Sequence, residues 1–85
     1  MDINIFWKKL KKNEGEQFRT VRDLPFTYEF CGEGAIRVSR TNQVLSKANF
    51  EKAIEQMPLS GPGQISKTVR GSAYVYVLLN DERLQ

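Results

Sequence analysis

The first apolar residues of the chain recur at the spacing of a helix. They stand at i, i+3, i+4 and i+7, at Ile3, Phe6, Trp7 and Leu10, which places them on one helix face. The spacing predicts an amphipathic helix over residues 1–12, with lysines on its opposite face. Such a helix can cover the open face of its own sheet, dock on a partner or lie on an anionic membrane surface. We favour the first role, because a chain of 85 residues needs its apolar faces to build a core.

From residue 17 to residue 45 the apolar positions alternate with polar ones, as they do in half-buried strands. Phe26, Tyr28 and Phe30 share one face of a strand, and Ile36 and Val38 share one face of the next. Turn signals separate the strands at residues 23–25, 32–34 and 40–42. Alternation extends over four stretches, residues 18–20, 26–31, 35–39 and 43–45. The last three predict a small three-stranded antiparallel meander.

Residues 46–80 return to helical spacing. Ser46 is a favourable N-cap, and Leu45 and Phe50 occupy the two positions of a hydrophobic staple. The apolar side chains that follow keep to one helix face as far as Met57. Pro58 is expected to end this helix.

A second short helix is expected from Pro62 to Arg70. Its inner face would carry Ile65 and Val69, and Gly71 would stop it. Together with the preceding helix it could form a helix-turn-helix that binds DNA. The more economical interpretation is two helices that pack on the sheet.

Residues 73–80 fit two structures. Ser72 is a good N-cap for a helix, whereas the run from Tyr74 to Val77 favours a strand by propensity. We favour the helix, and in either case the run of apolar residues predicts a central position in the core. Residues 81–85 are expected to be a frayed end.

These elements predict a single α+β domain over residues 1–85, in the order α-β-β-β-α-α-α. A helix over 1–12, strands over 17–45 and helices over 46–80 would form a small three-stranded antiparallel meander covered by helices on one face.

The composition argues against catalysis. The chain has no histidine and one cysteine, so it lacks the commonest general base, the commonest zinc ligand and any intrachain disulfide. No phosphate loop, dinucleotide fingerprint or EF-hand spacing is present. We therefore expect no enzyme activity, no cofactor and no metal site. Cys31 is interpreted as a small apolar residue at a strand end.

Two pairs of carboxylates and a pair of tyrosines have ordinary explanations. Glu51 and Glu55 lie on one helix face but supply too few ligands for a divalent cation. Glu29 and Glu33 straddle a turn and could form an acid/base pair only with a raised pKa. The tyrosines at positions 74 and 76 are expected to pack in the core or an interface rather than stack on bases.

The absence of a long apolar run excludes a membrane span of roughly 20 residues, and the amino terminus lacks the apolar stretch of a signal peptide. We expect a protein of the cytoplasm.

Charge gives the most specific functional indication. The chain has 13 basic and 10 acidic residues, a net charge of +3 and a pI of about 9.2. Such a balance is compatible with nucleic-acid binding. The candidate contacts are Arg37, Arg40, Lys47, Gln64, Lys67 and Arg70. The hypothesis is a non-catalytic module that binds nucleic acid; the alternative is a protein partner held by exposed apolar or aromatic side chains.

Overall fold

Three helices and two small antiparallel sheets build the fold, which a computed structural model describes for all 85 residues. In chain order the elements are α1 (Ile3–Lys12), β1 (Phe18–Arg19), β2 (Pro25–Phe26), β3 (Tyr28–Phe30), β4 (Ala35–Val38), β5 (Val44–Ser46), α2 (Lys47–Ile54), a short 3₁₀ helix η1 (Pro62–Gln64) and α3 (Ser72–Asn80). The α+β class is therefore confirmed.

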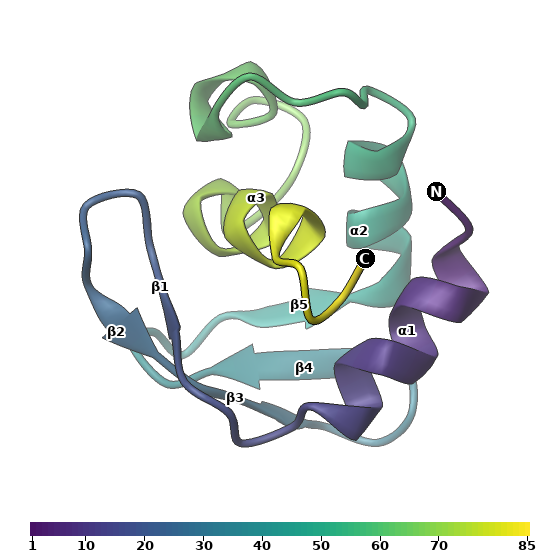
Figure 1. The fold of residues 1–85 in the computed structure, drawn as a ribbon, viewed down its shortest axis with the longest axis vertical. Helices are drawn as coiled ribbons and strands as arrows, with labels where there is room; N and C mark the ends of the chain where they lie inside the picture. Colours follow the sequence, from purple (N-terminus) through teal and green to yellow (C-terminus); the bar gives the residue numbers. More distant parts are fainter.

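The larger sheet is the predicted meander, with its strands in the order β3-β4-β5. Tyr28 pairs with Val38, and Ile36 pairs with Leu45, and all four side chains are buried on the same face. The three helices lie on that side of the sheet (Figure 1). The strands alternate in burial, so the opposite face carries exposed side chains.

The second sheet pairs β1 with β2 and was not predicted. Phe18 faces Phe26 across it, and their ring centroids lie 5.9 Å apart. The single strand expected over 26–31 is divided at Thr27, whose N–H donates to the Ser39 hydroxyl at 2.9 Å. Both parts have the same period of two, so alternation could not reveal that the chain passes from one sheet to another.

Helix α1 covers its own sheet, as expected from its apolar face. Phe6, Trp7 and Leu10 are buried in one core of 18 residues. The Tyr28 hydroxyl donates to the Leu10 carbonyl, which ties β3 to the helix. Burial raises the pKa of Tyr28, and the negative charge of Glu14 adds to that rise.

Helix α2 begins where the sequence placed it and ends earlier. The Ser46 hydroxyl accepts a hydrogen bond from the Asn49 N–H at 3.2 Å, so Ser46 is the predicted N-cap. The helix ends at Ile54 rather than at Pro58. The chain continues in tighter turns, in which the Met57 N–H donates to the Ile54 carbonyl at 3.1 Å.

The prediction of a helix from Pro62 to Arg70 is wrong. Only η1 forms there, followed by a single turn in which the Val69 N–H donates to the Ile65 carbonyl at 3.0 Å. Ile65 and Val69 are nevertheless buried, because one turn is enough to bring positions i and i+4 to the same side. The helix-turn-helix, which was the less favoured interpretation of these residues, is therefore absent.

Helix α3 resolves the ambiguity of residues 73–80 in favour of the helix, and Val75, Leu78 and Leu79 are buried at its inner face. Its N-cap is Gly71 and not Ser72. Gly71 has a φ of 64°, in the left-handed region that favours glycine. None of the helices has the length and apolar character needed to cross a bilayer.

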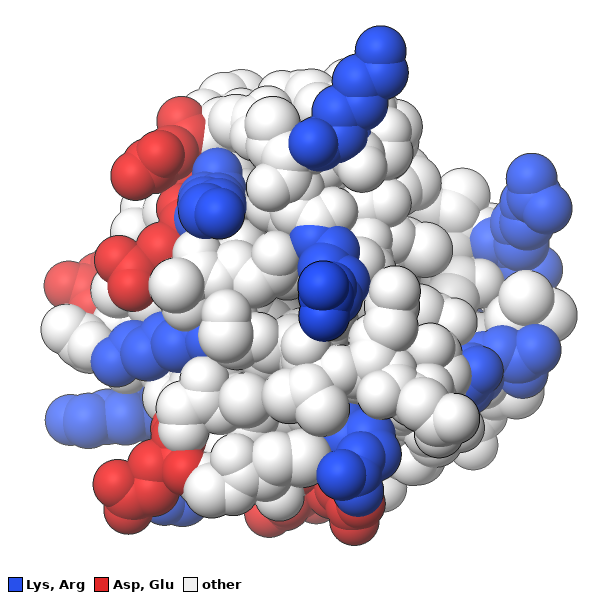
Figure 2. Space-filling model, turned by 180° about the vertical axis from the view of Figure 1, so that it is seen from behind, with Lys and Arg blue, Asp and Glu red and all other residues white.

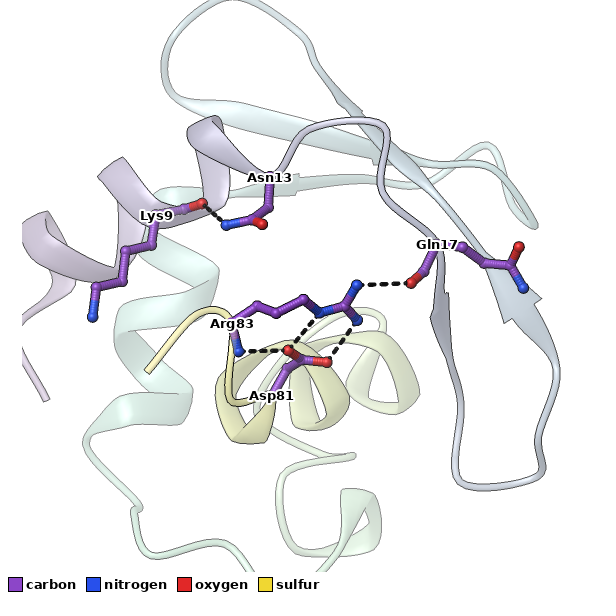
Figure 3. Close-up of polar contacts among 5 residues, drawn as sticks. All are labelled: Lys9, Asn13, Gln17, Asp81 and Arg83. Atoms are coloured by element: carbon purple, nitrogen blue, oxygen red, sulfur yellow. Dashed lines mark hydrogen bonds and ion pairs between the residues drawn. The ribbon is translucent and has the colours of Figure 1, made fainter.

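The predicted frayed end at residues 81–85 is wrong as well. Leu84 is only 1% exposed, and the guanidinium of Arg83 lies 3.9 Å from the centroid of the Phe18 ring. Arg83 also bonds both carboxylate oxygens of Asp81 and donates to the Gln17 carbonyl at 3.2 Å (Figure 3). The bond from Arg83 holds the pKa of Asp81 below its usual value.

Candidate nucleic-acid interface

The six predicted contact residues are spread over three parts of the surface. Arg37 lies on the exposed face of β4, and Arg40 follows that strand, where its Nη1 donates to the Pro25 carbonyl at 3.4 Å. Lys47 is the first residue of α2. The other three, Gln64, Lys67 and Arg70, belong to the segment that contains η1 and the turn after it.

Gln64 is exposed, but hydrogen bonds within its own loop already use its side-chain amide. Its Oε1 accepts from the Ser60 N–H at 2.9 Å, and its Nε2 donates to the Gln56 carbonyl at 3.0 Å. The side chain thus closes the loop that precedes η1. Thr68 is engaged in the same way, because its hydroxyl accepts from Gln56 Nε2 at 2.7 Å. Both side chains are exposed, and they stand on a 3₁₀ turn and the turn after it rather than on a recognition helix.

Arg70 lies beside Lys52, which was not among the predicted contacts. A shallow depression of about 300 Å³ lies between β5, α2 and the end of the 62–70 segment. Its lining residues are Val44, Ser46, Asn49, Lys52, Thr68 and Arg70. This set, named here the basic depression, contains two cations and no carboxylate. Lys52 follows Asn49 by three positions, which places both on one face of α2, and that spacing was visible in the sequence.

Asn49 fixes the position of Arg70. Its Nδ2 donates to the Arg70 carbonyl at 2.8 Å, and the Arg70 N–H donates to its Oδ1 at 2.9 Å. The next residue, Gly71, lies against Leu45 of β5 so closely that an added Cβ would be 2.9 Å from the Leu45 Cδ2 atom. The backbone of the turn is therefore held to α2 at Arg70 and packed against β5 at Gly71.

Arg37 borders the basic depression through the sheet register. It pairs with Val44 on one side and with Glu29 on the other. Neighbours across an antiparallel ladder have adjacent side chains, so Arg37 lies next to a wall of the basic depression. Its ion pair with Glu29 is 3.5 Å long and both side chains are more than half exposed, so the pair leaves the guanidinium largely free to bind an anion.

Lys47 belongs to a different basic surface. Its Nζ donates to Asn4 Oδ1 at 2.8 Å, which joins α2 to α1. A groove of about 680 Å³ between these helices is lined by Asn4, Trp7, Lys8, Lys11, Glu33, Gly34 and Lys47. This α1 groove holds three lysines, and it also holds a carboxylate. Lys8 and Lys11 were recognised in the sequence only as the polar face of a helix.

The charges are dispersed on the side of the molecule opposite to Figure 1. Figure 2 shows basic side chains that stand apart over mostly uncharged surface, with acidic ones along one side and the lower edge. Only three ion pairs are present, and neither Lys52, Lys67 nor Arg70 takes part in one. These three cations are therefore available to a polyanion.

The remaining candidates are arranged as ordinary surface and core residues. No three His, Cys, Asp or Glu side chains come together. Cys31 is a free, half-buried thiol at the end of β3. Tyr74 is half-buried, with its ring centroid 5.0 Å from that of Phe26. Comparison of the chain with protein-family models, with curated proteins and with solved structures gave no match.

Proposed function

We propose that the protein is a non-catalytic module that binds the phosphate backbone of nucleic acid through the basic depression. The observation that carries the proposal is that Lys52 and Arg70 line the same hollow, that neither makes an ion pair, and that no carboxylate lines it. Arg37 extends this positive surface onto the sheet. Phosphate contacts of this kind supply affinity that depends on salt and little on sequence.

The fixed geometry of the site supports the proposal. A phosphate needs a cation and a hydrogen-bond donor at the same place, and the hollow offers the Ser46 hydroxyl beside its cations. Arginine can bind a phosphate through two parallel N–H groups, whereas lysine acts as a point charge. Because Asn49 holds the backbone of Arg70, little ordering of the main chain is needed when a ligand binds.

Of the predicted contacts in the 62–70 segment, the proposal keeps Lys67 and leaves out Gln64. Lys67 lies in the turn between η1 and Arg70 and makes no ion pair. The amide of Gln64 is already used within its loop. We expect the module to act in a reducing compartment such as the cytoplasm, since its one cysteine is a free thiol.

The test compares two double charge reversals. Lys52→Glu with Arg70→Glu removes the cations of the basic depression, and Lys8→Glu with Lys11→Glu is the matched control in the α1 groove. Both variants lower the net charge of +3 by four units. Affinity for fluorescent duplex DNA and duplex RNA is measured by anisotropy at several salt concentrations.

About three phosphate contacts give a slope of log K against log salt of about −3 for the unmodified protein on duplex DNA. The variant of the basic depression should lose at least tenfold in affinity at low salt and show a flatter slope. The Lys8→Glu/Lys11→Glu control should keep the slope of the unmodified protein. Equal losses in both variants would mean that binding follows net charge and not this site, and no binding by the unmodified protein would refute the function.

A further inference from the structure

We propose that a second surface, between the tip of the β1–β2 hairpin and the start of α3, docks a short acidic and apolar peptide segment of a partner protein. This site is independent of the basic depression. The first observation is the exposure of two apolar side chains at the hairpin tip: Val21 is 64% exposed and Leu24 is 43% exposed. In Figure 1 this hairpin projects on the side away from α1.

Hydrogen bonds hold the backbone of the tip in one conformation. The Thr20 N–H donates to the Leu24 carbonyl at 3.0 Å, and the Leu24 N–H donates back to the Thr20 hydroxyl at 3.2 Å. Arg19 Nη1 donates to the carbonyl of Asp23 at 3.2 Å, across the turn in which Asp23 has a φ of 65°. A preorganised tip loses little conformational entropy when a partner binds, so its apolar surface can contribute to affinity.

A groove of about 450 Å³ lies between the tip and the start of α3. Its lining includes Val21 and Leu24 of the hairpin tip, Pro62 of η1, and Ala73 and Tyr74 of α3. This volume accommodates a few side chains, as expected for a short peptide segment. We call it the tip groove.

Charge decides the chemistry of the occupant. Arg22 lines the tip groove and makes no ion pair, and the neighbouring Asp23 pairs with Arg19 at 3.4 Å. No carboxylate lines the groove. A partner with an Asp or Glu beside its apolar side chain therefore complements the site. A second copy of this chain would bring another Arg22 to the tip, and like charge disfavours that occupant.

The experiment uses a phage library of random twelve-residue peptides, selected on the full chain and counter-selected on the Val21→Ser/Leu24→Ser variant. Both replaced side chains are exposed, so the variant should keep its melting curve. We expect the enriched peptides to share a large apolar residue next to Asp or Glu. One enriched peptide is then synthesised with a fluorescent label, and its Kd is measured by anisotropy.

Arg22→Glu should raise the Kd for this peptide at least tenfold. A peptide in which Lys replaces the acidic residue should bind the Arg22→Glu variant more tightly than the original peptide does. Ile5→Ser is the matched control, because Ile5 is 57% exposed on α1, away from the tip groove; it should leave the Kd unchanged. Duplex DNA should not displace the peptide, which separates this proposal from the nucleic-acid site.

Three outcomes would overturn the proposal. The first is a selection that enriches no sequence over the counter-selected variant. The second is an enriched peptide without acidic residues, or one that binds Arg22→Glu as well as it binds the unmodified chain. The third is a dimer in light scattering that the Val21→Ser/Leu24→Ser variant abolishes, since a second copy would then be the occupant.

Discussion

The indole N–H of Trp7 donates a hydrogen bond of 2.8 Å to the carbonyl oxygen of Glu33. This bond joins the middle of α1 to the turn between β3 and β4. The ring also packs edge-on against Phe30 and Phe50, with centroid separations of 5.5 Å in both cases. A single side chain thus connects the first helix, the sheet and α2, and the amino-terminal helix becomes part of the core.

Replacing Trp7 by phenylalanine tests this connection. Trp7→Phe keeps an aromatic ring but removes the donor to Glu33, and we expect the free energy of unfolding to fall by about 1 to 2 kcal/mol. Urea denaturation followed by far-ultraviolet circular dichroism measures it. Ile5→Ala on the exposed face of the same helix should change it by less than about 0.5 kcal/mol. Equal effects would show that α1 is not anchored through Trp7.

The carboxyl-terminal residues are expected to stabilise the fold. Leu84 is 1% exposed, so Leu84→Ala leaves a cavity and should cost about 2 to 5 kcal/mol. For a domain of this size that corresponds to a fall in Tm of roughly 8 °C or more. Glu82→Ala, on the exposed side of the same segment, should leave the melting curve almost unchanged. An unchanged Tm for Leu84→Ala would contradict the burial of Leu84 and support the original prediction of a frayed end.

Alanine substitutions at two glycines with similar backbone conformations distinguish the cost of backbone strain from the cost of a steric overlap. Gly71 and Gly32 have φ values of 64° and 71°, and a Cβ would meet Leu45 at the first position and nothing within 4 Å at the second. Alanine at either position costs about 1 kcal/mol for the left-handed conformation. Gly71→Ala adds an overlap with a fully buried side chain, so we expect it to cost at least about 1 kcal/mol more than Gly32→Ala in chemical denaturation. Equal costs would contradict the close contact with Leu45.

Stability should fall in alkali because of Tyr28. Burial raises the pKa of its phenol above the ordinary value of 10.0, so the folded state keeps the proton longer than the unfolded state does. The free energy of unfolding is then independent of this group below pH 10, and above it falls by about 1.4 kcal/mol per pH unit until the folded pKa is reached. Denaturation between pH 9 and pH 11 measures the slope. Tyr28→Phe should remove this contribution, whereas the half-buried Tyr76, replaced by phenylalanine, should leave it in place.

Much of the candidate site could not be predicted because its parts are distant in sequence. Arg70 and Arg37 were selected by charge alone, and nothing in their local sequence indicates that Lys52 lies in the same hollow as Arg70. The amide of Asn49 brings the turn to α2, and the register of β4 with β5 brings Arg37 beside Val44. Gln64 was selected as a contact, and its hydrogen bonds could not be foreseen because they depend on the fold of its own loop.

The sequence by itself determined the elements whose stability is local or periodic. The i, i+3, i+4, i+7 spacing specified α1, Ser46 specified the start of α2, and alternation specified the meander, because each of these patterns reflects one face that must be buried. Tertiary structure decided what periodicity cannot encode. Thr27 divides two sheets of identical period, a single turn satisfies the spacing of Ile65 and Val69, and Leu84 is one apolar residue without a repeat. Its burial depends on the other members of the core, and only the assembled core provides a place for it.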